Sequence, residues 1–249
     1  MKVSIITATY NRESTVVRAI SSIKNQTYQN IQVIVIDGAS KDNTISLIKP
    51  MLSDEDVIQS EPDGGIYDAL NKGLAIADGE IVAFLHSDDL YSDNYVISNV
   101  VKIFLDQSID IVYGDVSFFS NNEPAVIKRK YKSGALSKRR LAWGKMPAHP
   151  AIFIRRRVYD KVGFFKTNFK IAADYEFLCR VINYKNLKSI YLHSVLVQMQ
   201  LGGISTKGLK STFILNKEVY RALRSNGIYT NLFMLLSKYP SKFFQFLRL

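Results

Sequence analysis

The sequence has little of what disulfide-rich, metal-cage and membrane-spanning proteins need. Its single cysteine, Cys179, excludes an intramolecular disulfide framework and a zinc site built from several cysteines. Three histidines argue against a multi-histidine metal cage. No apolar run reaches the roughly 18 residues that a membrane-spanning helix requires. We interpret MKVSIITATYNR as a first β-strand and not a signal peptide, and therefore expect a cytoplasmic protein.

Charge is distributed unevenly along the 249 residues. The net charge is +11, but residues 1–115 hold 17 acidic and 8 basic side chains, whereas residues 116–249 hold 5 acidic and 25 basic ones. The basic half contains no recognisable nucleic-acid-binding module. Carboxylates collected at strand ends suggest metal or sugar chemistry in the first half. The cations of the second half suggest phosphates or an anionic membrane surface as partners.

Hydrophobic periodicity predicts an α/β fold. Continuous apolar strands that alternate with helices indicate a mostly parallel sheet covered on both faces. The first half is expected to form strands at 3–8, 31–36, 57–59, 81–85 and 109–113, and helices at 14–26, 66–77 and 94–105. The second half is expected to form a hairpin within 116–131, strands at 151–154, 187–192 and 195–199, and helices at 172–183, 207–225 and 230–247.

Polar side chains follow the predicted strands. The carboxyl ends of parallel strands share one rim of a sheet, where ligands bind. The residues concerned are Thr9, Tyr10, Asp37, the run Asp63-Gly64-Gly65, and the pair Asp88-Asp89. Each alone is also typical of a turn or helix cap. Together they suggest a nucleotide-diphosphate site, because Mg²⁺ or Mn²⁺ is often held by one or two carboxylates plus substrate phosphates. The absence of a Gly-x-Gly-x-x-Gly run and of a Walker lysine motif disfavours dinucleotide dehydrogenases and P-loop enzymes.

Several longer stretches resemble glycosyltransferase family 2, whose members have the Rossmann-like GT-A fold. The stretches are VSIITATYNRESTVVRAISSIKNQTYQNIQVIVIDGASKDNT, EPDGGIYDALNKGLAIADGEIVAFLHSDD, HPAIFIRR and AADYEF. The resemblance is continuous over about residues 1–115 and patchy to about residue 206. It implies a GT-A domain over 1–206, with a nucleotide-sugar half (1–115) and an acceptor-side half (116–206). A C-terminal helical segment, 207–249, would follow.

The resemblance also implies an activity and a set of site residues. The activity is inverting transfer of a hexosyl or N-acetylhexosaminyl group from a nucleotide sugar, preferably a UDP-sugar, to an acceptor hydroxyl. Asp174 falls on the catalytic-base position, and Asp89 on the direct ligand position for Mn²⁺ or Mg²⁺, with Asp88 nearer the ribose and diphosphate. The implied donor-binding residues are Thr9, Tyr10, Asp37, Asp63, Asp68, Asn71 and Asp88, joined by a side chain of the basic half such as His149, Arg155 or Arg156.

The sequence departs from the family pattern at two positions. His86 stands where the metal motif often begins with Asp, and Ala173 stands where Glu commonly precedes the catalytic Asp. Without the resemblance, Asp174 is better explained as a carboxylate stabilised by a helix N-terminus. Two alternatives to a glycosyltransferase are a sugar-nucleotide nucleotidyltransferase, which normally has a Gly-rich amino-terminal loop absent here, and a non-catalytic nucleotide-sugar-binding scaffold.

The C-terminal run TNLFMLLSKYPSKFFQFLRL is apolar, aromatic and basic. Such a segment can lie in a membrane interface, with cations towards anionic headgroups. It can equally pack on the domain or on a partner chain. We expect peripheral membrane contact through residues 228–249, which fits a lipid-linked glycan acceptor in surface polysaccharide or lipopolysaccharide synthesis. No nucleic-acid partner is expected, and the sequence leaves the oligomeric state open.

Overall fold

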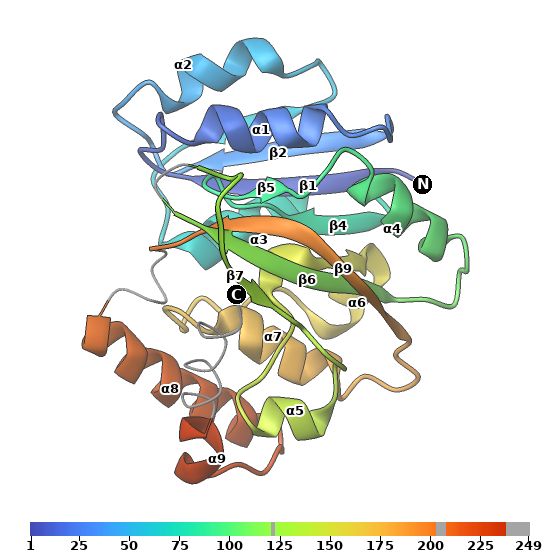
Figure 1. Ribbon diagram of the computed structural model, residues 1–249, viewed down its shortest axis with the longest axis vertical. Coiled ribbons are helices and arrows are strands. Elements are labelled where there is room, and N and C mark those ends of the chain that lie inside the picture. Colours follow the sequence, from blue (N-terminus) through green and yellow to red (C-terminus); the bar gives the residue numbers. More distant parts are fainter. Residues whose placement is uncertain (121–122, 203–207, 238–249) are drawn as a thin grey trace.

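The computed structural model describes residues 1–120, 123–202 and 208–237, in which a curled sheet lies between helices (Figure 1). The strand order is β3-β2-β1-β4-β8-β6-β9-β5, and β7 pairs with β6. The strands are β1 (Val3–Thr9), β2 (Ile31–Asp37), β3 (Val57–Ser60), β4 (Ile81–Phe84), β5 (Leu90–Tyr91), β6 (Ile111–Phe119), β7 (Ile127–Tyr131), β8 (Ile152–Arg155) and β9 (Ser189–Gln200). The helices are α1 (Val16–Lys24), α2 (Thr44–Ile48), α3 (Ile66–Ile76), α4 (Val96–Phe104), α5 (Lys138–Ala142), α6 (Arg156–Val162), α7 (Ala173–Val181), α8 (Gly208–Ser225) and α9 (Leu232–Leu236), with short 3₁₀ turns at Lys49–Met51 and His149–Ala151.

The α/β fold class is confirmed, and parallel pairing predominates in the first half of the chain. Strands β3, β2, β1 and β4 are mutually parallel neighbours, so Thr9, Asp37 and Ser60 fall side by side in the register. The second half is mixed: β8 runs antiparallel to both β4 and β6, whereas β6 and β9 are parallel. Because β8 is reversed, its carboxyl end lies beside the amino end of β4.

The pleat of β1 separates two hydrophobic clusters. Ile5 packs on one face with residues of α1 and α4, and Ile6 packs on the other with residues of α3, α6, α7 and α8. Both side chains are fully buried. Strands that are apolar on both faces therefore read as continuous hydrophobic runs, which is why the sequence located them.

Two expected strands, 187–192 and 195–199, are one continuous strand, β9. The sequence suggested a break at the polar pair His193-Ser194, but β9 passes this pair by a register shift against β6 on either side of Asp115. Sequence reasoning missed the short elements β5, α5 and α6. The helix expected over 230–247 begins as α9, and residues 238–249 lie outside the described chain. Within the described residues no helix is long and apolar enough to cross a membrane.

Candidate active site

Asp37, at the carboxyl end of β2, organises the loops that follow β2 and β3. Its side chain is fully buried and accepts hydrogen bonds from the Ser40 amide (2.9 Å), the Ser40 hydroxyl and the Ser60 hydroxyl (2.6 Å). The Gly38 amide donates to the carbonyl of Thr9 (2.9 Å), which ties the end of β1 to the same rim. Three strand ends are thus joined around one carboxylate.

The loop after β3 is held by its own acidic side chains. Asp63 accepts from the amide of Gly65 (2.8 Å), and Asp68 accepts from the amide of Gly64 (2.9 Å). A side-chain carbon at position 38 would lie 2.8 Å from Oδ2 of Asp63, so the two loops approach closely here and a larger residue would displace the Asp63 carboxylate. Tyr10 borders the same position and is 54% exposed. The structure therefore brings together the predicted residues Tyr10, Asp63 and Asp68.

Asp89, shortly after β4, has a buried carboxylate that is only half satisfied. Oδ1 accepts a hydrogen bond from the amide of Gln200 (3.1 Å), whereas Oδ2 is buried with no hydrogen-bond partner among the described residues. Burial, reinforced by the neighbouring charge of Asp88, raises the pKa of Asp89 well above its usual range, and the Arg18 guanidinium opposes this rise. Sequence reasoning missed Arg18, which contacts the site from α1 and donates to the Gln200 side chain (2.9 Å).

This arrangement fits a divalent cation. An unpartnered carboxylate oxygen beside a second carboxylate is stabilised by a hard cation that prefers oxygen ligands. Across residues 1–120, 123–202 and 208–237, no three His, Cys, Asp or Glu side chains cluster as a complete protein cage would. The donor set is therefore suited to a cation that also binds phosphate oxygens of a ligand, with Asp89 as ligand and Asp88 adjacent.

Two histidines border the end of β4. The His149 ring stacks on Phe84, with 4.8 Å between centroids, and lies 5.8 Å from the His86 ring. Burial, with the nearby His86, lowers the pKa of His149 to about 3, and burial also lowers the pKa of His86. Both imidazoles are therefore neutral near pH 7. His149 lies beside His86, and its role in donor binding stays a prediction; its Nε2 is buried with no hydrogen-bond partner among the described residues.

Asp174 lies in the first turn of α7, on the second half of the chain. Its Oδ1 accepts from the amide of Tyr175 (2.8 Å) and lies 3.1 Å from the hydroxyl oxygen of Tyr67 on α3. Burial raises the pKa of Asp174 to about 6 against these hydrogen bonds, which lower it. A carboxylate with this pKa is ionised at pH 7 and is more basic than an ordinary aspartate, which suits a proton acceptor.

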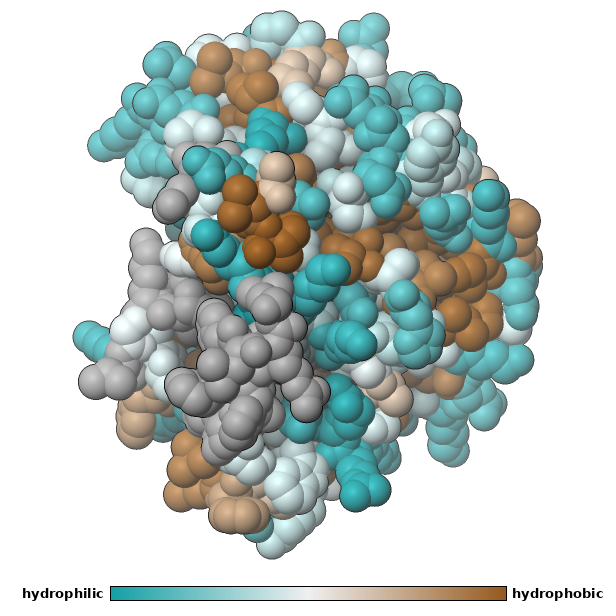
Figure 2. Space-filling view, in the orientation of Figure 1, coloured by the Kyte–Doolittle hydropathy of each residue, from teal (hydrophilic) through white to brown (hydrophobic). Residues whose placement is uncertain are grey.

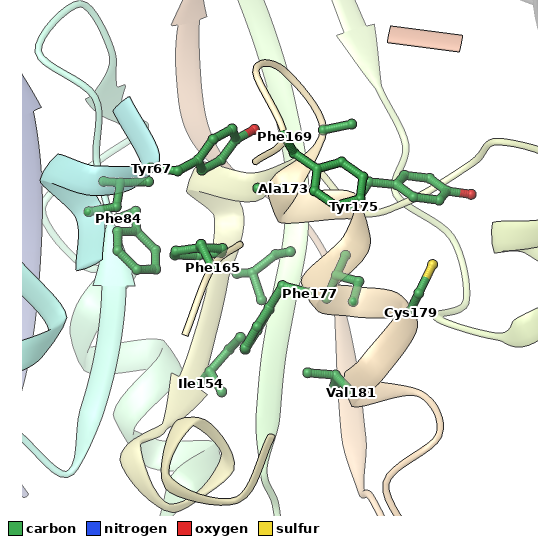
Figure 3. Packing of buried hydrophobic residues seen from close by; sticks show 14 of the residues in the cluster. Tyr67, Phe84, Ile154, Phe165, Phe169, Ala173, Tyr175, Phe177, Cys179 and Val181 are labelled. Atoms are coloured by element: carbon green, nitrogen blue, oxygen red, sulfur yellow. The ribbon is translucent and has the colours of Figure 1, made fainter. Parts of the chain in front are cut away.

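Aromatic packing connects Asp174 to the donor-side strands. The Phe165 ring contacts Tyr67 (5.8 Å between centroids), Phe84 (5.4 Å) and Phe177 of α7 (5.2 Å) (Figure 3). The side-chain amide of Asn71 bonds the main chain of Phe165 in both directions, at 2.8 and 3.0 Å. In the structure this amide holds the Phe165 loop against α3, and the prediction that Asn71 binds the nucleotide sugar stays a prediction.

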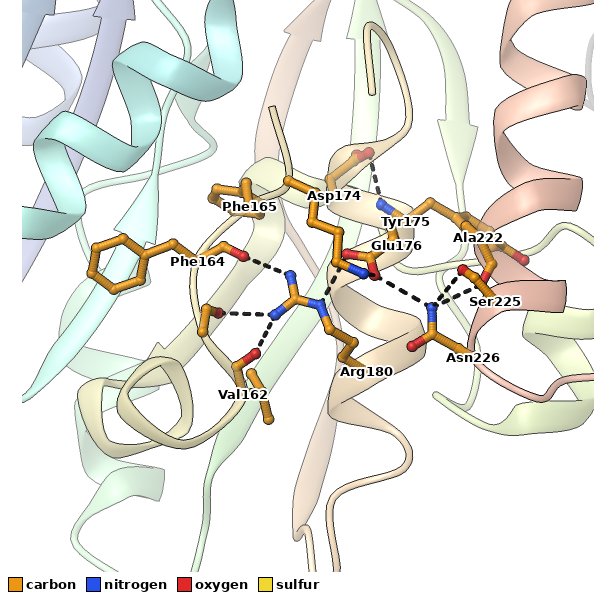
Figure 4. Close-up of polar contacts among 12 residues, drawn as sticks. Val162, Phe164, Phe165, Asp174, Tyr175, Glu176, Arg180, Ala222, Ser225 and Asn226 are labelled. Carbon is orange, nitrogen blue, oxygen red and sulfur yellow. Dashed lines mark hydrogen bonds and ion pairs between the residues drawn. The ribbon is translucent and has the colours of Figure 1, made fainter. Parts of the chain in front are cut away.

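A buried ion-pair network joins α7 to the segment that follows α6. Glu176 is fully buried and pairs with Lys166 (2.6 Å) and Arg180 (2.9 Å). Arg180 also donates to the carbonyls of Val162 and Phe164 (Figure 4). Sequence reasoning did not single out this network. Charged residues at an i, i+4 spacing usually indicate an exposed helix pair, and only the tertiary structure shows that the Glu176 carboxylate is buried.

Arg155 is corrected by the structure. It was suggested as a phosphate-binding residue, but β8 runs antiparallel to β4, and Arg155 pairs with Ile81 at the amino end of β4, opposite the end that leads to Asp89. Its guanidinium is buried and donates to the carbonyls of Ile109 (2.7 Å) and Phe104. Arg156 likewise donates to carbonyls at the end of α3. Both arginines therefore bond main-chain carbonyls near the amino end of β4, away from Asp89.

The fold is an α/β domain with carboxylates at the ends of its parallel strands, and comparisons with known proteins identify its family. Glycosyl transferase family 2 matches residues 4–164. A PGL/p-HBAD biosynthesis glycosyltransferase of Mycobacterium tuberculosis is 30% identical over 216 residues, which cover 85% of this chain and 82% of that one. An uncharacterized glycosyltransferase of Haemophilus influenzae is 27% identical over 192 residues, 72% of this chain and 59% of the other. The chain therefore belongs to glycosyltransferase family 2, a family of glycosyltransferases.

Solved structures share the GT-A fold. S. aureus TarS 1–349 in complex with UDP-GlcNAc superimposes with a TM-score of 0.69 at 19% identity, over 90% of this chain and 66% of that one. The mannosyltransferase PcManGT of Pyrobaculum calidifontis, in complex with GDP-Man and Mn²⁺, gives a TM-score of 0.63 at 21% identity, over 88% and 64%. The chain spans less than two thirds of the length of these two neighbours.

Proposed function

We propose that this protein is an inverting, cation-dependent glycosyltransferase that uses a UDP-sugar. The observation that carries the proposal is the half-satisfied Asp89 carboxylate at the carboxyl end of the parallel strands. The raised pKa of Asp174 supports direct displacement with inversion. That reaction needs one general base and no nucleophilic carboxylate of the enzyme. The complexes of TarS with UDP-GlcNAc and of PcManGT with GDP-Man and Mn²⁺ are consistent with this reading.

The proposed reaction assigns a distinct task to each half of the chain. Asp174 takes the proton of the acceptor hydroxyl as that oxygen forms a bond to the anomeric carbon of the sugar. The bond from the anomeric carbon to the diphosphate oxygen breaks, and the nucleoside diphosphate leaves. A bound Mn²⁺ or Mg²⁺ would neutralise the charge that develops on the diphosphate. Asp89 would hold it, and Asp88 would line the ribose and diphosphate side.

Asp37 is the proposed base-recognition residue. Among the described residues the Ser40 hydroxyl is the one donor to its Oδ1, and a carboxylate oxygen can accept a second hydrogen bond, which we assign to the N–H of a uracil ring. Thr9 ends β1 next to Asp37, and its hydroxyl has no partner among the described residues. We assign Thr9, Tyr10 and Asp63 to the same nucleoside side of the site.

Isothermal titration calorimetry tests the donor proposal. UDP binding in Mn²⁺ is expected, with loss of affinity in EDTA, weaker binding of GDP, and loss of the Mn²⁺ effect in Asp89→Ala. Asp78→Ala, which removes an exposed carboxylate paired with Lys2, is the matched control and is expected to bind UDP normally. Absence of UDP and GDP binding by the wild-type protein in Mn²⁺ contradicts the donor site.

The proposed acceptor is a lipid-linked glycan presented at an anionic membrane surface. Three large apolar side chains around α9 are well exposed: Tyr229 (69%), Leu232 (65%) and Phe233 (75%). Figure 2 shows hydrophobic side chains gathered at this lower end of the molecule. Leu232 and Phe233 line a shallow groove together with Tyr220 and Asn231. Tyr220 also lines an adjoining groove, whose cations are Lys170, Lys217, Arg221 and Arg224. Apolar side chains beside cations suit an anionic interface.

Vesicle co-sedimentation tests the membrane contact. Binding to phosphatidylglycerol vesicles is expected to exceed binding to phosphatidylcholine vesicles and to fall in the double variant Leu232→Ser/Phe233→Ser. Leu105→Ser removes a similarly exposed leucine, 69% accessible, from the end of α4 and serves as the control. Equal binding by the wild type and the double variant contradicts the proposal, and a change only in oligomeric state assigns the surface to a protein partner.

A further inference from the structure

One carboxylate on α8 holds the main chain that leads into α7. The amides of Lys170, Ile171 and Ala172 all donate to Glu218, at 2.7, 2.9 and 3.0 Å. Glu218 is buried, with 8% of its surface exposed. Ala172 is the N-cap of α7 and has no side-chain oxygen to accept a hydrogen bond, so the acceptor comes from a helix 46 residues further along the chain.

The middle residue of these three, Ile171, is also held by α3. The Tyr67 hydroxyl donates to the carbonyl of Ile171 (2.6 Å), and its oxygen lies 3.1 Å from Oδ1 of Asp174. The peptide groups flanking Ile171 are therefore fixed both through the amide, by Glu218, and through the carbonyl, by Tyr67. Asp174 follows Ala172 by two residues, so its carboxylate has little freedom to move relative to this clamp.

We propose that Glu218 is a positioning residue for Asp174, acting through the main chain of residues 170–172. The inference rests on the proposed function, because it assigns Glu218 a part in keeping the catalytic base in place. It also gives α8 a task in the reaction, although α8 lies outside the part of the chain that matches the family. Charge-assisted hydrogen bonds to a carboxylate are the stronger kind, and three of them converge here.

The charge of Glu218 also acts on Asp174. The Tyr67 hydroxyl faces Asp174 from α3 and lowers its pKa by hydrogen bonding, and Glu218 faces it from α8 and raises its pKa by repulsion. Loss of the Glu218 charge should therefore lower the pKa of Asp174, whereas a purely structural residue would leave that pKa in place. This difference in outcome makes the proposal testable without a sugar substrate.

The test is a ¹³C NMR titration of the Asp174 carboxyl in the full chain, assigned by its loss in Asp174→Asn. The wild-type transition is expected near pH 6. Glu218→Gln, which keeps the size of the side chain, should move the transition to lower pH. Asp160→Asn, which removes an exposed carboxylate paired with Arg156 on α6, should leave it unchanged. An unchanged Asp174 titration in Glu218→Gln overturns the proposal.

Turnover separates positioning from folding. In hydrolysis of UDP-GlcNAc, with water as the acceptor, Glu218→Ala should lower kcat about tenfold to a hundredfold while the KM for the donor stays the same, because a misplaced base affects chemistry and not donor binding. Glu218→Gln should recover part of that loss. If Glu218→Ala fails to fold, the NMR comparison of the wild type with Glu218→Gln still tests whether Glu218 acts on Asp174. Failure of the wild-type protein to bind UDP refutes the proposed function, whereas normal UDP binding with an unmoved Asp174 titration refutes only the role of Glu218.

Discussion

The two halves of the chain use their carboxylates differently. Residues 1–115 contain 17 acidic side chains, and those at the strand ends bond mainly to nearby loops, as Asp37 and Asp63 do. Residues 116–249 contain only 5, of which three, Asp174, Glu176 and Glu218, lie in or against the amino-terminal part of α7. In the basic half, therefore, the few acidic residues are concentrated around one helix end.

Two carboxylates, the buried Asp89 of the first half and the partly buried Asp174 of the second half, show what this difference means. Asp89 has an oxygen without a partner among the described residues, so a cation would stabilise it. Oδ1 of Asp174 is contacted by the amide of Tyr175 and the hydroxyl of Tyr67, and burial raises the pKa of Asp174 to about 6, which favours binding of a proton over that of an ordinary aspartate. Different environments assign the same side chain to two different tasks. Four predictions test this comparison.

The largest effect is expected from Asp174→Asn. Loss of the base should lower kcat by about a thousandfold, within the usual range for general base catalysis. UDP affinity, measured by calorimetry, should remain the same, because the carboxylates proposed to bind the donor, Asp37, Asp63, Asp88 and Asp89, lie on the other half of the chain. A variant that keeps full transfer activity contradicts the assignment of Asp174.

The next effect separates Asp37 from Asp89. Asp37→Asn disturbs a carboxylate that accepts three hydrogen bonds and should reduce the free energy of unfolding by about 1 to 3 kcal/mol. Asp89→Asn removes a buried charge with an unsatisfied oxygen and should leave metal-free stability unchanged or raise it. Urea unfolding in EDTA measures both. Equal destabilisation by the two variants would remove the distinction between a loop-organising and a ligand-binding carboxylate.

A smaller effect is expected from pH. Because Asp174 must be ionised to accept a proton and its pKa is raised to about 6, kcat/KM should fall as pH decreases through 6, by about tenfold between pH 7 and pH 5. UDP binding followed over the same range serves as the control for the donor site. A rate that stays constant down to pH 5 means that another group takes the proton.

The smallest effect on donor binding is expected from Arg155→Met. The guanidinium bonds main-chain carbonyls near the amino end of β4, away from Asp89, so UDP affinity should not change. The free energy of unfolding should decrease by about 2 kcal/mol, because hydrogen bonds to a charged group are lost. A marked loss of UDP affinity without a decrease in the free energy of unfolding would instead indicate that Arg155 binds the donor.

The sequence predicted well those features that depend on local pattern. Continuous apolar runs located the parallel strands, and the rule that ligands bind at their carboxyl ends directed attention to Asp37 and Asp89. Asp174 was found only through the resemblance to the family, because a single carboxylate in a first helical turn has an ordinary structural explanation. Position along the chain did not reveal that Asn71 bonds the Phe165 main chain.

What the sequence by itself determined is the set of side chains at each strand end, since the strand period and the parallel order place them on one rim. Only the tertiary structure decided which of them are satisfied and which contact the second half of the chain. The antiparallel direction of β8 places Arg155 at the amino end of β4, away from Asp89, and the packing of α8 brings Glu218 to the start of α7. These contacts join residues that are far apart in the chain, and burial and partner geometry, which set the behaviour of a carboxylate, are properties of the packed chain.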